Sequence, residues 1–146
     1  MPTLGISSGS SPIAFYTDMN INDNNALDIL EKLGSCLRIE EDKFDAFTSI
    51  FGAGPAFISH LSNTLAKIAK EHGFEEPEPW IREILDGTSH IHKSDEKNSF
   101  ENIVDMVASK GGVTEAALNK INEKGIEDIW NQAINDAIIK SKALGD

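Results

Sequence analysis

The residues best suited to chemistry lie in the short segment 109–114, with the sequence SKGGVT, directly before a helical run that begins at Glu115. Glycine lets the main chain approach a ligand closely, and the N–H groups of a helix's first turn lack intrahelical partners and attract anions. A carboxylate or a phosphate can therefore dock at this turn. The alternative is an ordinary Gly-Gly turn in which Thr114 caps the following helix.

Cysteine and histidine give no second reactive centre. Cys36 is the only cysteine, so an internal disulfide is excluded. Its short apolar surroundings indicate a small buried residue of a strand rather than a reactive thiol. His90 and His92 are two positions apart, which points them to different sides of a helix and makes a poor zinc pair. We expect no metal site.

Two glycine-containing elements carry a resemblance to a known family. The first is GAGPAF at residues 52–57. The second has its matching positions at Phe100, Ile103, Val107, Ala108, Ser109, Gly111, Gly112, Thr114, Ala117, Leu118 and Asn122. Together they resemble the motifs of pyrroline-5-carboxylate reductase, a family that reduces a cyclic imine to proline with NAD(P)H. Lys110 stands where that family usually has proline, and Ala53 where it has serine.

For the substrate, the resemblance implies a site in the second element. The carboxylate would bind the backbone amides around Gly111, Gly112 and Val113, and Ser109 would shape the turn. Thr114 would be the catalytic group, hydrogen-bonding the ring nitrogen. A protonated imine is already electrophilic and the hydride comes from the cofactor, so no side-chain acid or base is required.

For the cofactor, the resemblance implies that Gly54 and Pro55 face the nicotinamide of NADP or NAD. A plain turn followed by a helix start explains these two residues equally well. The dinucleotide fingerprint G-x-G-x-x-G fails here, because its sixth position is Phe57. We therefore expect the chain alone to bind neither cofactor and to lack reductase activity.

The same resemblance sets the expected domain organisation. Residues 1–3, with the sequence MPT, fall on a Met-Pro-Asn element late in the family's dinucleotide-binding domain. Residues 1–40 would then be a remnant of the C-terminal end of that domain, and residues 41–146 a helical dimerisation and substrate-binding domain. The expected fold is mainly α, with a helical dimerisation domain preceded by a short α/β remnant of a Rossmann-like domain.

The pattern of residues 1–40 is consistent with such a remnant. Residues 5–12 are too polar and flexible to pack alone. Strands are predicted at residues 13–17 and 36–40, with a helix from about Asp23 to Leu33 between them. Two isolated strands cannot cover their own edges, so this part needs a larger sheet or must be partly disordered.

From residue 41 onward the pattern is helical. Helices are predicted at residues 55–72, after Pro77 and Pro79, at 99–108, shortly after Gly112, and at about 125–144. The last of these carries an apolar stripe made of Ile126, Ile129, Trp130, Ala133, Ile134, Ala137 and Ile138. Core packing alone explains such a stripe, but together with the resemblance it favours a homodimer.

Composition excludes several classes of partner. The 146 residues include 24 acidic and 13 basic side chains, and the net charge of −11 repels nucleic acid and anionic membranes. No apolar run approaches the roughly 20 residues of a membrane helix, and the first residues lack the pattern of an export signal. The sequence indicates a cytoplasmic protein with a small-molecule carboxylate as its substrate.

Three functions are compatible with these observations. The first is a truncated pyrroline-5-carboxylate reductase-like protein of proline biosynthesis that is inactive alone. The second is a non-catalytic helical homodimerisation module or a partner of a separate dinucleotide-binding chain. The third is an unrelated small-anion binder that uses the 109–114 turn.

Overall fold

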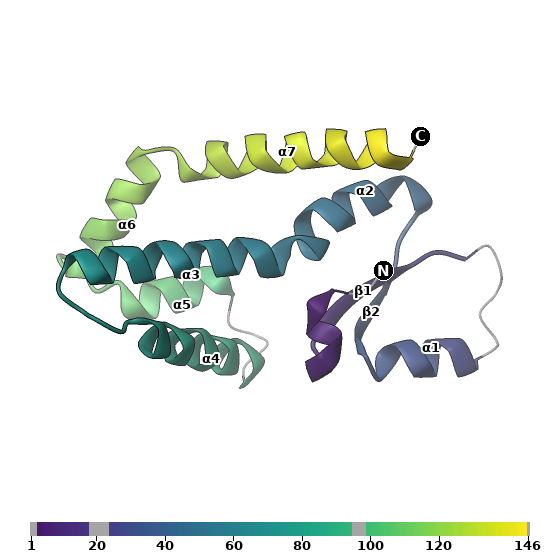
Figure 1. Ribbon diagram of the computed structural model, residues 1–146, viewed down its shortest axis with the longest axis horizontal. Coiled ribbons are helices and arrows are strands. Elements are labelled where there is room, and N and C mark those ends of the chain that lie inside the picture. The colour runs from purple at the N-terminus through teal and green to yellow at the C-terminus, as the bar shows by residue number, and fades with distance from the viewer. Residues whose placement is uncertain (1–2, 18–23, 95–98, 146) are drawn as a thin grey trace. The chain divides into compact units, whose positions relative to one another are not determined.

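The computed structural model describes residues 3–17, 24–94 and 99–145. The chain divides into two compact units (Figure 1). The first unit contains Met1–His60 and Trp130–Asp146, and the second contains Leu61–Ile129. The predictions for Met1, Pro2 and the helix start at Asp23 lie outside the described residues.

A small parallel sheet forms the start of the first unit. β1 (Ser11–Phe15) pairs with β2 (Gly34–Arg38), and the helix α1 (Asn24–Glu31) lies between them in sequence. Parallel neighbours need such a crossover, because a tight hairpin cannot connect them. Both predicted strands are confirmed, but each begins two residues earlier than expected. The register explains this, since Ser11 lies opposite Gly34 and a Cβ at Gly34 would meet the Ser11 carbonyl oxygen at 2.0 Å.

Residues 3–9 are more ordered than their polar composition predicts. They form the 3₁₀ turn η1 (Leu4–Ser8), in which the Thr3 side chain accepts a hydrogen bond from the Gly5 amide. The Thr3 amide donates in turn to the Ser11 hydroxyl at 2.7 Å. Short hydroxyl side chains bond readily to nearby backbone, and these bonds replace the apolar packing that the segment lacks.

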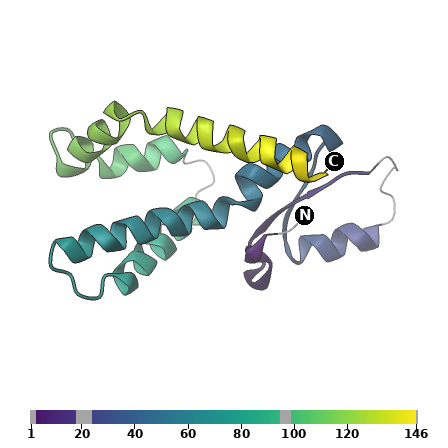
Figure 2. The ribbon, with the colours of Figure 1, turned by 45° about the horizontal axis from the view of Figure 1, so that its top comes forward.

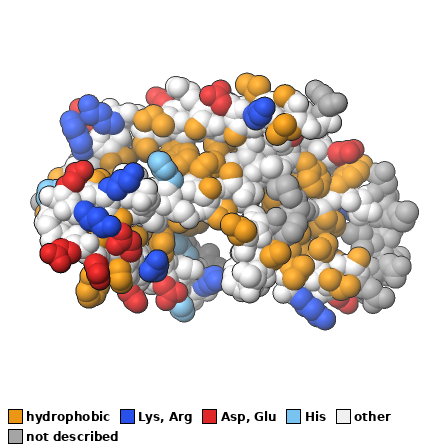
Figure 3. Space-filling view, in the orientation of Figure 1, with side chains coloured by type: hydrophobic (Ala, Val, Ile, Leu, Met, Phe, Trp, Pro, Cys, Tyr) orange, Lys and Arg blue, Asp and Glu red, His pale blue; other side chains and the backbone are white. Residues whose placement is uncertain are grey.

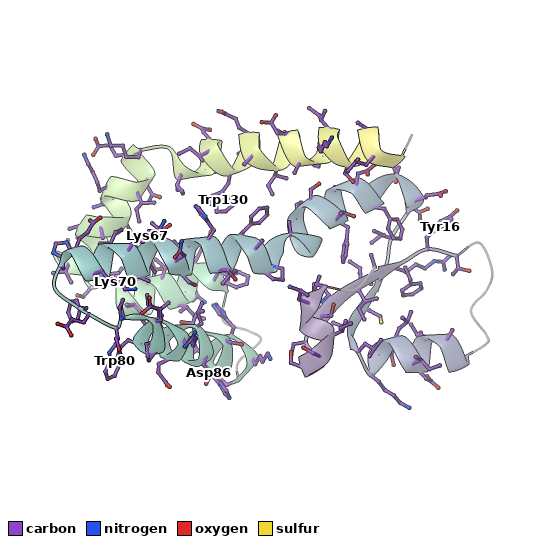
Figure 4. The ribbon with its side chains drawn as sticks, in the orientation of Figure 1. Tyr16, Lys67, Lys70, Trp80, Asp86 and Trp130 are labelled. Atoms are coloured by element: carbon purple, nitrogen blue, oxygen red, sulfur yellow. The ribbon has the colours of Figure 1, made fainter. Side chains whose placement is uncertain are left out.

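The rest of the first unit is helical. A 3₁₀ turn, η2 (Glu41–Lys43), leads into α2 (Phe44–Phe47) and the π-helical turn η3 (Thr48–Gly52). The helix α3 begins at Gly54 and the helix α7 ends at Gly145. In this unit Trp130 of α7, labelled in Figure 4, packs edge to face against a phenylalanine ring of α3. The ring centroids of Trp130 and Phe57 are 5.1 Å apart.

The second unit contains the remaining helices. They are the end of α3 (Gly54–Glu71), α4 (Glu78–Ser94), α5 (Phe100–Val107), α6 (Val113–Glu123) and the first turn of α7 (Ile126–Gly145). Figures 1 and 2 both show α4 beside the end of α3. The predicted helices are confirmed with ends within about two residues, and the mainly α fold class is confirmed with them.

Few apolar side chains are buried in this single chain. Among the described residues, the buried hydrophobic core consists of Ile13, Ala14, Phe47, Ala66 and Ile103. Many larger ones are exposed, and Figure 3 shows hydrophobic side chains at the surface over several elements. Trp80 and Ile84 of α4 are 69% and 60% exposed, so these two residues are not part of a core within the described chain.

No helix in the described residues is long and apolar enough to cross a membrane. Over the same residues, no group of three or more histidine, cysteine, aspartate or glutamate side chains is placed to hold a metal ion.

Candidate functional site

The turn before α6 has the geometry of a helix N-terminus open to a ligand. Gly111 adopts a left-handed φ of 75°, and Gly112 is extended, with φ −84° and ψ 169°, as the N-cap residue of α6. The Gly112 amide donates to the Ser109 carbonyl at 2.9 Å and closes the turn. The structure thus brings together the five predicted substrate-side residues, from Ser109 to Thr114, in one turn.

Both glycines are required by the turn itself. A Cβ at Gly112 would lie 2.6 Å from the Ser109 hydroxyl oxygen and 2.8 Å from its carbonyl oxygen. A Cβ at Gly111 would meet no atom within 4 Å, but its φ is one that other residues rarely adopt. Ser109 therefore packs directly against Gly112 in this turn.

A carboxylate of the chain already contacts this turn. The Glu115 side chain accepts a hydrogen bond from the Gly111 amide at 2.7 Å. The first hydrogen bond of α6 runs from the Ala116 amide to the Gly112 carbonyl, so the amides of Val113, Thr114 and Glu115 precede it. None of these three amides has an acceptor in the described part of the chain. The turn thus holds one anionic group and has three further amide donors beside it.

The structure corrects the alternative in which Thr114 caps the helix. The N-cap is Gly112, which makes no side-chain capping hydrogen bond. The helix α6 begins at Val113, so Thr114 is its second residue rather than its N-cap. Thr114 is half-buried, and its hydroxyl has no hydrogen-bond partner among the residues that the structure describes.

Sequence reasoning missed Glu115. It lies three positions after the N-cap Gly112, which is the spacing of the acidic residue in a capping box. The usual capping box closes on the N-cap amide, whereas here the carboxylate reaches the amide of the preceding residue, Gly111. The three-residue spacing between Gly112 and Glu115 was visible in the sequence. Which amide the Glu115 carboxylate bonds depends on the left-handed backbone conformation of Gly111.

Gly54 and Pro55, predicted on the cofactor side, lie in the first unit and form the first turn of α3. The preceding residue, Ala53, is already helical and donates to the Thr48 carbonyl at 3.0 Å, while the Ala56 amide donates to the Ala53 carbonyl at 2.9 Å. Proline has no N–H. This end of α3 therefore has few free donors for a phosphate, although a Cβ at Gly54 would meet nothing within 4 Å.

Elsewhere among the described residues, Glu78 and Cys36 have shifted pKa values. A hydrogen bond from the Lys70 ammonium group lowers the pKa of Glu78 and joins the end of α3 to the start of α4. Partial burial raises the pKa of the Cys36 thiol, which keeps it in the unreactive protonated form. Cys36 lies in β2 as predicted, but it is half-buried rather than fully buried.

Comparison with known proteins identifies the helical part. Residues 41–144 match the family model described as pyrroline-5-carboxylate reductase dimerisation. A pyrroline-5-carboxylate reductase of Aquifex aeolicus is 33% identical over 150 residues, covering 99% of this chain and 56% of the relative. The chain spans about half the length of the curated relatives it matches.

Solved structures agree with this match. The 1-pyrroline-5-carboxylate reductase of Streptococcus pyogenes has a TM-score of 0.82 and 27% identity, and the alignment covers 98% of this chain and 57% of that one. The pyrroline carboxylate reductase of Plasmodium falciparum, solved with NADP bound, has a TM-score of 0.84, with 22% identity, 100% coverage of this chain and 62% of that one. At that identity the second likeness shows the fold alone.

Proposed function

The chain belongs to the pyrroline-5-carboxylate reductase dimerisation family, and from this we propose that it provides the homodimer contacts and the substrate-carboxylate site of such a reductase. The family reaction is the NAD(P)H-dependent reduction of 1-pyrroline-5-carboxylate to L-proline. The observation that carries the proposal is the turn before α6, where the Gly111 amide already holds the carboxylate of Glu115.

In this proposal the residues of the turn bind and orient the substrate. Its carboxylate takes the place of Glu115 on the Gly111 amide and receives further hydrogen bonds from the amides of Val113 and Thr114, since the Gly112 amide already bonds the Ser109 carbonyl. The Thr114 hydroxyl bonds the ring nitrogen and so fixes which face of the imine is presented. The chain itself would contribute to the reaction by hydrogen-bonding the charged substrate and by fixing the orientation of its imine.

The cofactor, NADP or NAD, supplies a hydride when it is bound. The open surface at Gly54 and Pro55 fits the flat face of a nicotinamide ring, because no side chain covers Gly54. The same helix end has few free amides for phosphates. We therefore propose that these two residues contact the nicotinamide only, and that the chain alone does not bind the dinucleotide.

We also propose the domain division at residue 40. The family match begins at residue 41, which supports a helical dimerisation and substrate-binding domain over residues 41–146. In the described residues β1 and β2 pair only with each other, and an isolated two-stranded sheet is marginal. This supports the assignment of residues 1–40 to the C-terminal end of a dinucleotide-binding domain.

An NMR titration tests the proposed site. Adding L-proline to the ¹⁵N-labelled chain should shift the amide signals of Gly111, Gly112 and Val113 with a single dissociation constant. The amides of α4 serve as the internal reference. If the three turn amides stay unchanged while other amides shift with proline concentration, the carboxylate site lies elsewhere and the proposal is wrong.

A further inference from the structure

Lys110 is the position in the candidate turn where this chain departs from the family's usual residue, proline. The turn runs from Ser109 to Gly112 and is closed by the hydrogen bond from the Gly112 amide to the Ser109 carbonyl. With a left-handed φ of 75° at its third residue, Gly111, it has the conformation of a type II turn. Proline is favoured at the second position of such a turn. The turn geometry therefore explains the proline that the family usually has there, but not the lysine of this chain.

The ammonium group of Lys110 stands apart from other charges. Lys110 is exposed, and it is the only charged residue between Asp105 and Glu115. It takes part in none of the ion pairs found among the described residues. The Glu115 carboxylate bonds the Gly111 amide instead. In the part of the chain that the structure describes, no ion pair neutralises the positive charge beside the turn.

We propose that Lys110 makes the turn selective for carboxylate ligands of net negative charge over zwitterions. This inference rests on the proposed carboxylate site at the same turn. Because Lys110 adjoins Gly111, its flexible side chain keeps the ammonium group within about 10 Å of a carboxylate bound there, the range over which charges interact in 0.1 M salt. A zwitterion gains from this attraction at its carboxylate and loses by repulsion at its own cationic nitrogen.

This selection separates the two ends of the family reaction. A ring imine with an uncharged nitrogen carries one net negative charge, whereas L-proline has a carboxylate and a protonated nitrogen and carries none. Lys110 therefore favours the unreduced ligand over the reduced one, which helps the product to leave. The rest of the chain acts against any anion, because its net charge is −11. A cation at the turn offsets this repulsion where the ligand binds.

The test compares two ligands that share a five-membered ring and a carboxylate, namely the anion cyclopentanecarboxylate and the zwitterion L-proline. Their dissociation constants are measured from the amide shifts of Gly111 and Val113 in the ¹⁵N-labelled chain. Lys110→Gln should weaken cyclopentanecarboxylate binding by about two- to fivefold, the range of an exposed charge pair, and should leave L-proline binding unchanged. The effect should vanish in about 1 M NaCl, where charges are screened beyond about 3 Å.

Two further variants separate the charge from the turn geometry. Lys110→Pro should weaken cyclopentanecarboxylate binding as Lys110→Gln does, but should raise the thermal midpoint by about 1–4 °C, because proline restricts the unfolded chain. The Lys110 amide donates no hydrogen bond in the described residues, so proline removes none. Lys124→Gln is the matched control, since it removes an exposed lysine at the other end of α6. It should leave the affinity for both ligands unchanged.

The outcomes distinguish this inference from the proposed carboxylate site. If neither ligand shifts the turn amides of the wild-type chain, both are wrong. If both ligands bind at the turn and Lys110→Gln changes neither affinity, or weakens both equally, the site stands and the selection by charge is wrong. A loss confined to cyclopentanecarboxylate in Lys110→Gln and Lys110→Pro, with Lys124→Gln unaffected, supports the inference.

Discussion

The helices α6 and α3 both begin at glycines, but their N-termini are built differently. At α6 the chain enters from an extended Gly112, so the first amides of the helix have no preceding helical turn to bond. At α3 the chain enters from the π-helical turn η3, and Ala53 is already in a helical conformation. The amide of Ala53 is therefore bonded to Thr48 before α3 begins.

The glycines serve different purposes in these two places. Gly112 is required by its own turn, because Ser109 occupies the space of a side chain. Gly54 has open space around it, so the local packing would accept a larger residue there. The same residue type in a sequence pattern can therefore be required by the backbone, as at Gly112, or stand where the local packing would accept a side chain, as at Gly54. The stability of glycine-to-alanine variants distinguishes these two cases.

The largest expected effect is a difference in the free energy of unfolding between the Gly112→Ala and Gly54→Ala variants. Gly112→Ala should destabilise the chain by about 1–3 kcal/mol, because its methyl group would lie 2.6 Å from the Ser109 hydroxyl oxygen. It should also abolish proline binding at the distorted turn. Gly54→Ala should be neutral or stabilising by up to about 1 kcal/mol, since alanine fits a helical position without strain. Urea denaturation of both variants checks this, and equal losses would contradict the contrast.

A smaller effect is expected at the Thr114 hydroxyl. Thr114→Ala should weaken L-proline binding by about tenfold, because one hydrogen bond to a charged ligand is lost. Thr88→Ala is the matched control, since Thr88 is an exposed threonine of α4 in the same unit. Calorimetric titration measures both. An unchanged affinity in Thr114→Ala would mean that the substrate nitrogen is bound by another group.

Local sequence signals predicted the helical elements well. The helix predicted at residues 99–108 is α5 (Phe100–Val107), and Ser99 caps it by accepting a hydrogen bond from the Asn102 amide at 3.1 Å. Serine before an apolar periodic run is a signal carried by adjacent residues. The strand ends were displaced because their positions depend on the pairing of residues 23 positions apart, Ser11 with Gly34.

Other features have no local signal. Nothing in the sequence indicated the π-helical turn η3 that leads into α3, because its backbone pattern has no characteristic residues. The helix after Pro77 and Pro79 was predicted, but apolar residues at helical spacing cannot say what covers them, and Trp80 of α4 is exposed in the single chain. For the candidate site, the sequence found the turn and its glycines but missed the carboxylate that occupies it.

The smallest expected effect concerns that carboxylate. If Glu115 competes with the ligand for the Gly111 amide, then Glu115→Gln should raise the affinity for L-proline by about fivefold, because a charge-assisted hydrogen bond is replaced by a weaker neutral one. Glu123→Gln removes the same charge at the other end of α6, where the side chain pairs with Lys120, and so controls for the net charge. A lower affinity in Glu115→Gln alone would show that Glu115 holds the turn in its binding shape. The carboxylate of Glu115 would then be needed to hold the turn before α6 in its binding conformation. In that case the N-termini of α6 and α3 would differ in the conformation of the preceding turn, and not in their number of unbonded amides.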